Sequence, residues 1–140
     1  MSDAPLTGGC LCGAVRFELA VAPEVAGYCH CTRCQRRTGT ASSAQALIDG
    51  SALSFVAGEE FVAGWTPPDG GMEKCFCRTC GAHLGSRDPE TRVYAAIRMS
   101  AWDRDPGVRF VYRQHLASAA SWEPVPDDGL QRFDGQRSGP

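Results

Sequence analysis

The sequence predicts a mainly β fold of short antiparallel sheets, with few or no helices. Apolar residues alternate with polar ones over short stretches, and this is the period of a half-buried strand. Glycine- and proline-rich turn signals separate these stretches at short intervals, as in all-β domains. No segment has the length, periodicity and caps of a long amphipathic helix, so we expect at most a short helical turn at 32–37.

The expected strands follow from this alternation, taken in chain order. The clearest case is the series Val15, Phe17, Leu19 and Val21, which places four apolar side chains on one face of a strand. Similar apolar stretches predict strands at 53–56, 61–65, 93–97 and 108–112. Turn signals lie between them at Gly58, 66–71, 88–89 and 105–107.

Length and composition predict one folded domain. The chain has 140 residues, 43% of them hydrophobic and 21% charged, which suits a single core. We expect this domain to span 1–140, with a core of about 8–133 and a frayed tail at 134–140. The net charge of −2 argues against a nucleic-acid partner, because such domains usually carry a positive excess.

The sequence shows no targeting or membrane segment. No apolar run approaches the ~20 residues that span a bilayer, and residues 1–7 lack the basic and apolar regions of a secretory signal. We therefore expect a cytoplasmic protein without a membrane partner. In that reducing compartment stable disulfides are rare.

Eight cysteines stand in three groups, and the spacing within the groups is typical of zinc ligands. Two cysteines one or two residues apart in a tight turn can direct both sulfurs at one ion. Gly13 and Gly81 each follow such a pair and tolerate the positive φ that the turn needs. Thiol redox chemistry is the competing interpretation. The groups are Cys10 and Cys12; Cys29, Cys31 and Cys34; and Cys75, Cys77 and Cys80.

Spacing alone leaves the pairing of these groups open. Two sites of four cysteines would both be closed and structural. One site of four and one of three, with a spare cysteine, would leave an open coordination position for water or substrate. Only an open zinc can act as a Lewis acid, so this difference decides between a structural and a catalytic role.

Four segments resemble a known family, that of glutathione-dependent formaldehyde-activating enzymes, which includes centromere-protein-V-like proteins. They are GGCLCGAVRFE at 8–18, CHCTRCQRRTG at 29–39, FCRTCGAHL at 76–84, and AASWEPVPDDGL at 119–130 followed by Phe133. The resemblance implies an Mss4-like zinc-ribbon-type fold that holds two zinc ions per chain.

The resemblance also implies the ligand sets. Cys10, Cys12, Cys77 and Cys80 match the family's structural four-cysteine site. The residues Cys29, Cys31 and Cys34 match its catalytic three-cysteine zinc. Cys75 falls outside both sets, so it is either a buried apolar residue or a fourth ligand that closes the open site.

The implied activity is that of a carbon–sulfur lyase, which joins glutathione or a related thiol to formaldehyde or a related aldehyde. His30 is the nearest candidate for proton transfer, with a solvent-facing position in the turn as the alternative. Arg36 and Arg37 could bind a carboxylate of a peptide-like thiol, or they could balance the charge of the thiolates.

Two segments depart from the family pattern and are candidates for the border of the substrate pocket, namely 97–103 and 112–115. A different function is a zinc-stabilised protein-binding module with two closed sites. We also expect exposed strand edges, which would allow a homodimer.

Overall fold

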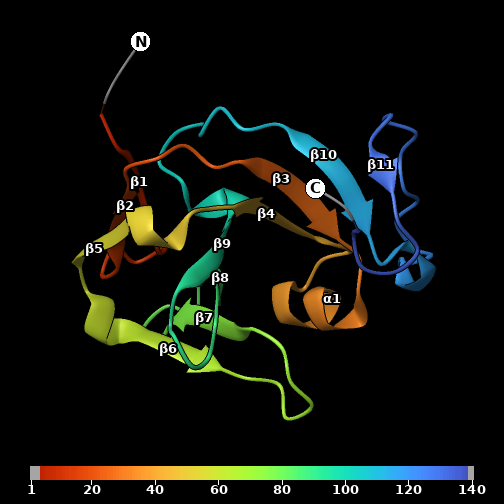
Figure 1. The fold of residues 1–140 in the computed structure, drawn as a ribbon. Helices are drawn as coiled ribbons and strands as arrows, with labels where there is room; N and C mark the ends of the chain where they lie inside the picture. Colours follow the sequence, from red (N-terminus) through yellow and green to blue (C-terminus); the bar gives the residue numbers. More distant parts are fainter. Residues whose placement is uncertain (1–3, 139–140) are drawn as a thin grey trace.

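The computed structural model describes residues 4–138, and the mainly β prediction is confirmed. The strands form two sheets, one of three strands and one of eight. Figure 1 shows the small sheet at one side of the molecule and strands β10 and β11 at the other. In the described part no helix is long and apolar enough to cross a membrane.

The small sheet contains β1 (Leu6–Gly9), β2 (Arg16–Leu19) and β5 (Leu53–Ala57), in the order β1-β2-β5 with antiparallel pairing. Phe17 of β2 is 1% exposed and packs edge-on against Phe55 and Trp102. The alternation that predicts this strand therefore arises from an aromatic core between the two sheets.

The large sheet has the order β11-β10-β3-β4-β9-β8-β7-β6. Its strands are β3 (Val25–Cys29), β4 (Ser43–Leu47), β6 (Val62–Trp65), β7 (Glu73–Cys77), β8 (His83–Arg87), β9 (Tyr94–Arg98), β10 (Phe110–Gln114) and β11 (Gln131–Arg132). Most neighbours are antiparallel as expected, but β10 is parallel to both β3 and β11. A parallel pair needs a long crossover connection, and the distance along the chain from β3 to β10 provides it.

One α-helix, α1 (Thr32–Thr38), follows β3 and corresponds to the expected helical turn. Cys31 is its N-cap, and Gly39 ends it in the left-handed conformation with φ 71°. Four single 3₁₀ turns complete the described elements: η1 (Gly50–Ala52), η2 (Glu59–Phe61), η3 (Met99–Ala101) and η4 (Leu116–Ser118).

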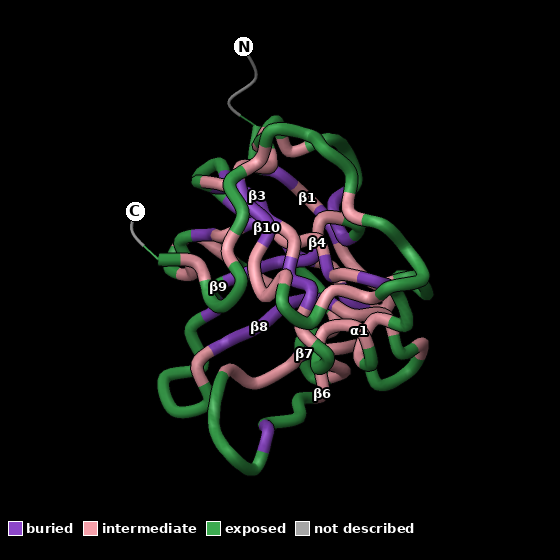
Figure 2. The backbone as a smooth tube through the Cα atoms, turned by 90° about the vertical axis from the view of Figure 1, so that its right-hand side faces the viewer, coloured by how far each residue is buried: buried purple, intermediate pink, exposed green. Residues whose placement is uncertain are grey.

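Most buried residues lie in or next to the strands, and most of the exposed backbone belongs to loops, as Figure 2 shows. The apolar core includes Val15, Leu84 and Ile97, which are between 0% and 1% exposed. It lies between the small sheet and strands β4, β7, β8 and β9. Cys75 and Cys77 of β7 belong to this core, and Cys10 and Cys80 pack against it.

The tail that we expect to fray is attached to β10 up to Arg137. The backbone N–H of His115 donates to the carbonyl of Gly135 at 2.8 Å, and that of Arg137 donates to Gln114 Oε1 at 2.9 Å. The Arg137 guanidinium also lies 4.8 Å from the centre of the Tyr112 ring. Residues 139–140 of the expected tail lie outside the described part.

A methyl group added at Gly27 would strongly disturb the large sheet. A Cβ built there would lie 2.1 Å from Tyr112 Cζ, and that side chain is only 2% exposed and has little room to move. We expect Gly27→Ala to lower the free energy of unfolding by about 1–3 kcal/mol, as overpacking does. Denaturant unfolding checks this, with Gly135→Ala as the control because nothing lies within 4 Å of its Cβ position. Equal stability of both variants would contradict the prediction.

Candidate metal centres

The four-cysteine group joins the two sheets. Cys10 and Cys12 follow β1 of the small sheet, while Cys77 ends β7 and Cys80 precedes β8 in the large sheet. Their four sulfurs all lie within 4.8 Å of one another. A metal ion at this point would therefore connect the sheets at their ends.

Two tight turns bring these sulfurs together. Gly13 and Gly81 have φ values of 84° and 77°, so the predicted role of both glycines is confirmed. The Val15 N–H donates to Cys10 Sγ at 3.2 Å, and Gly81 N–H donates to the Cys77 carbonyl at 2.7 Å. The Val15 N–H stabilises the Cys10 thiolate, and the Gly81 N–H closes the turn that contains Cys77 and Cys80.

The spacing of the sulfurs fits zinc. Sulfurs bound tetrahedrally at about 2.3 Å from the ion lie roughly 3.8 Å apart. The Cys10–Cys12 and Cys12–Cys77 sulfur distances are 3.6 and 3.9 Å. Hydrogen bonds from the Ala82 and Cys12 backbones lower the pKa of Cys80 to about 6, which favours a charged ligand. All four residues can hold a zinc ion.

The three-cysteine group forms where β3 meets α1. Cys29 is the last residue of β3, Cys31 is the N-cap of α1, and Cys34 lies in the first turn. Cys31 Sγ accepts the Cys34 N–H at 3.3 Å, the usual capping geometry with sulfur in place of oxygen. The three sulfurs lie within 4.8 Å of one another.

Without a cation these three sulfurs share their protons unequally. Hydrogen bonds from Cys29 and Cys31 lower the pKa of Cys34, while hydrogen bonding with Cys31 and Cys34 raises the pKa of Cys29. The Cys34 thiolate is therefore stabilised at the cost of the Cys29 thiolate, because like charges this close disfavour each other. A divalent cation would stabilise all three as thiolates, so the group fits zinc.

No fourth histidine, cysteine or carboxylate donor joins this group among the described residues. Cys75 is 2% exposed and lies in the apolar core, where its environment includes Tyr94. Burial raises the pKa of this thiol, which favours its neutral form. Of the two alternatives left open for Cys75, the structure shows the buried apolar residue.

His30 also lies apart from the three sulfurs. It is 4% exposed, so it does not face solvent as the alternative assumed. Its Nε2 lies 3.2 Å from Arg113 Nη1, which can only donate, so Nε2 accepts the hydrogen bond. Burial, followed by the charge of Arg113, lowers the pKa of His30 and keeps the ring neutral.

A cavity of about 940 Å³ opens beside the three-cysteine group. One face of the large sheet forms its floor, because residues directly opposite each other on paired strands share a face. One row of pairs runs from Tyr112 through Gly27 and Gln45 to Arg98, and a second from Leu47 through Ala96 and Ser86 to Lys74. Cys29, on β3, lies within this floor.

The cavity is strongly basic. Six cationic side chains line it, and there is no aspartate or glutamate among its described lining residues. Both predicted substrate-binding arginines are present; Arg36 is exposed, and Arg37 is half-buried next to the thiolates. The cations are Arg33, Arg36, Arg37, Lys74, Arg98 and Arg137.

The two departing segments both reach this cavity, as the sequence suggests. Segment 97–103 contributes Arg98, and segment 112–115 contributes Tyr112, Gln114 and His115. Sequence reasoning missed Lys74 and Arg137, which are remote from the cysteine motifs along the chain. Their only signal is positive charge, and that does not reveal position.

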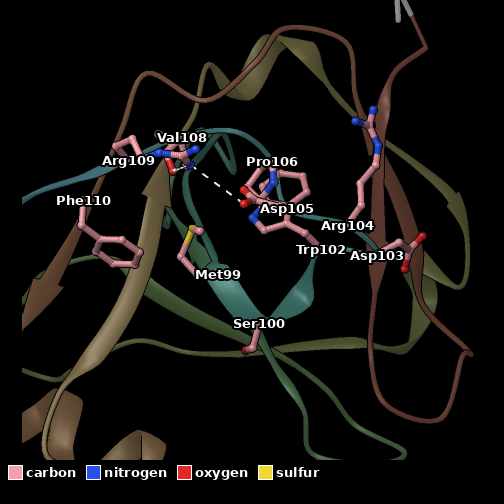
Figure 3. Close-up of a pocket in the computed structure, with 10 residues that line it drawn as sticks. All are labelled: Met99, Ser100, Trp102, Asp103, Arg104, Asp105, Pro106, Val108, Arg109 and Phe110. Carbon is pink, nitrogen blue, oxygen red and sulfur yellow. Dashed lines mark hydrogen bonds and ion pairs between the residues drawn. The ribbon is translucent and has the colours of Figure 1, made fainter.

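A separate hollow of about 470 Å³ is lined by residues within 99–110, from the segment that connects β9 to β10 along the chain and from the start of β10 (Figure 3). It contains the indole of Trp102 and the pair Arg109–Asp105, whose charged atoms are 3.9 Å apart. No cysteine is among its described lining residues. The metal centres therefore do not use this hollow.

Comparisons with known proteins agree with the cysteine motifs. Residues 5–118 match the family model described as glutathione-dependent formaldehyde-activating enzyme, and this span includes all eight cysteines. The chain is also similar to the crystal structure of a Rhodobacter sphaeroides protein, a Northeast Structural Genomics target. That match has a TM-score of 0.54 and 25% identity, and covers 75% of this chain and 99% of the other.

Proposed function

Because the chain belongs to the glutathione-dependent formaldehyde-activating enzyme family, we propose that it is a zinc-dependent carbon–sulfur lyase. Its reaction joins glutathione or a related thiol to formaldehyde or a related aldehyde. The observation that carries this proposal is the three-cysteine group, which has no fourth protein donor among the described residues and opens onto a basic cavity.

We assign Cys29, Cys31 and Cys34 to the catalytic zinc, and Cys10, Cys12, Cys77 and Cys80 to the structural one. Bound zinc favours the thiolate form of a substrate thiol at neutral pH. In the addition, the sulfur–carbon bond forms, the carbonyl π bond breaks, and the proton lost by the thiol ends on the former carbonyl oxygen.

The remaining residues bind and orient the reactants. Arg37, next to the thiolates, offsets negative charge that the metal leaves uncompensated. His30 positions the strand–helix junction instead of transferring protons, because Arg113 occupies its Nε2. His115 lines the cavity and is the better-placed proton carrier. The eight free thiols suit a reducing compartment such as the cytoplasm.

The alternative of a protein-binding module needs a closed second site. Cys75 and His30 were the two residues able to close it. Cys75 lies in the apolar core, and the His30 ring is hydrogen-bonded to Arg113 and does not join the three sulfurs. The open group therefore favours the enzyme. We leave the homodimer as a proposal that sedimentation would test.

The test compares wild type with Cys31→Ser. We expect Cys31→Ser to stay folded, lose one of two zinc ions and lower the exchange rate between glutathione and ¹³C-formaldehyde about 100-fold or more, because even indirect partners of a metal ligand can be worth 10–100-fold. Exchange NMR measures the rate above the spontaneous reaction, and elemental analysis gives the zinc content.

The control is Cys75→Ser, which should keep both zinc ions and the wild-type rate. Two results would sink the proposal. The first is that Cys31→Ser catalyses the exchange between glutathione and formaldehyde as fast as wild type. The second is that Cys31→Ser unfolds when it loses its zinc ion, since the three-cysteine site would then be structural.

A further inference from the structure

Unpartnered guanidinium nitrogens gather around the three-cysteine cavity. In the described part, six buried side-chain nitrogen or oxygen atoms have no hydrogen-bond partner, and four belong to arginines that line this cavity. They are Arg37 Nε and Nη1, Arg98 Nε and Arg137 Nε. Buried donors are normally satisfied, so such a cluster needs an explanation.

Arg98 is the most informative of the three. Arg98 is 4% exposed, and its side chain donates a long hydrogen bond of 3.4 Å from Nη1 to Gln45 Oε1. The other buried arginines, Arg87 and Arg113, each bind a carboxylate through two nitrogens. Among the described ion pairs Arg98 has none. A buried cation without an anion is costly, so a ligand anion is the natural partner.

The thiolates do not account for all of this positive charge. Three thiolates around a divalent cation carry one net negative charge, and Arg37 next to Cys34 is enough to balance it. Arg98, Lys74 and Arg137 remain without acidic neighbours in the cavity lining. The excess therefore points to an anionic substrate.

Arg98 and Arg137 approach the cavity from opposite sides. Arg98 lies on β9, whereas Arg137 covers Tyr112 on β10, with β3 and β4 between these strands. The backbones of β9 and β10 are three strand spacings apart across the sheet, which is roughly 14 Å. Cys29 lies on β3, between them. A ligand with sulfur at the cysteines could thus place one acidic group toward each arginine.

We propose that Arg98 and Arg137 bind two separate carboxylates of the reacting thiol, so that the cavity selects a thiol with an acidic group at each end. Planar guanidinium groups match carboxylates geometrically and bind them through paired hydrogen bonds. This assignment rests on the proposed function and makes both arginines specificity-determining residues.

The test uses S-methylglutathione, which cannot form a thiolate and so isolates carboxylate recognition from chemistry. Calorimetry on the zinc-loaded protein compares the free acid, its two monoethyl esters and its diethyl ester. We expect the free acid to bind at least tenfold more tightly than the diester. Arg98→Gln should remove the effect of one ester, and Arg137→Gln that of the other.

The control variant is Arg104→Gln, because Arg104 is exposed and lines the separate hollow of Figure 3. It should keep the full ester dependence. Equal affinity for free acid and diester in wild type would overturn the proposal. Full displacement of the probe by inorganic phosphate, at phosphate concentrations near the probe's own dissociation constant, would also overturn it by indicating one anion site.

Stability without ligand gives a second readout. If Arg98 serves to bind a ligand, the Arg98→Met variant should unfold at the wild-type temperature or above when no ligand is present. S-methylglutathione should then raise its unfolding temperature much less than it raises that of wild type. A merely structural Arg98 would instead lower the unfolding temperature and leave the relative shift unchanged. These measurements need no turnover, so a missing lyase activity and a missing carboxylate site are told apart.

Discussion

Replacing Cys77 by serine is expected to remove one zinc ion and to unfold most of the chain at ambient temperature. Cys77 is 0% exposed and supplies its sulfur to the four-cysteine group that connects the two sheets. A structural zinc site contributes about 10–16 kcal/mol in small domains. The whole folding free energy of a domain is about 5–15 kcal/mol. Losing a ligand therefore removes a large fraction of the total.

Cys75→Ser is the matched control for this prediction. Both residues lie on β7 and are buried, and they differ in that Cys75 belongs to neither cysteine group. We expect the control to keep two zinc ions and to lose about 1–3 kcal/mol, the cost of a poorly satisfied buried polar group. Circular dichroism and zinc analysis of both variants check this. A folded Cys77→Ser protein with two zinc ions would show that the group is not a structural metal site.

The strands predicted from the sequence are those whose inward face is apolar. The 15–21 alternation and the stretches near 53, 61, 93 and 108 correspond to strands β2, β5, β6, β9 and β10. The expected position of Val21 is wrong, because β2 ends at Leu19 and Val21 is 55% exposed. In β2, β5, β6 and β9, apolar residues such as Phe17 and Ile97 belong to the core or pack against it, whereas β10 buries Tyr112 on the cavity side. The alternation of apolar and polar residues arises because one face of each strand is buried.

The sequence did not predict six of the described strands, namely β1, β3, β4, β7, β8 and β11, and three of these share one reason. β4, β7 and β8 carry Gln45, Lys74 and Ser86 on the face that forms the cavity floor. A strand with polar or small side chains on both faces shows no clear apolar alternation, so the pattern that predicts a strand is weak in these three.

The cysteine positions could be read from the sequence, but their environment could not. The spacing along the chain predicts which sulfurs can lie in one turn. Which of these turns come together at one metal ion could be predicted only from the family resemblance or seen in the structure. The burial of His30 against Arg113, 83 residues away, leaves no local signal in either segment. The same is true of the meeting of Arg98 and Arg137 at one cavity.

The buried ion pair between Arg87 and Glu73 is the second large expected effect. Arg87 Nε and Nη2 donate to the two carboxylate oxygens of Glu73 at 2.7 and 3.0 Å. The side chains are 6% and 13% exposed. Arg87→Met leaves the carboxylate with only a distant contact to Arg92 at 4.0 Å. We expect a loss of about 3–5 kcal/mol, since removing one partner leaves a buried charge unpaired.

This pair also predicts how stability depends on pH. Hydrogen bonds from Arg87 hold the pKa of Glu73 below its ordinary value of 4.5. The folded state therefore binds this proton less readily than the unfolded state, and stability rises with pH across that range. The contribution is complete above the ordinary pKa and is lost as pH falls through the lower value of the folded state. Arg87 keeps its charge throughout, because the same bonds raise its pKa.

Denaturant unfolding between pH 3 and pH 7 separates these effects when Arg87→Met is compared with the double variant Glu73→Gln/Arg87→Met. The double variant removes both charges, so we expect it to be more stable than Arg87→Met at pH 7. Arg87→Met should in turn become relatively more stable toward acid, because protonation neutralises the orphaned carboxylate. If both variants instead had the same stability at every pH, the loss would come from packing of the Arg87 stem and not from an unpaired charge.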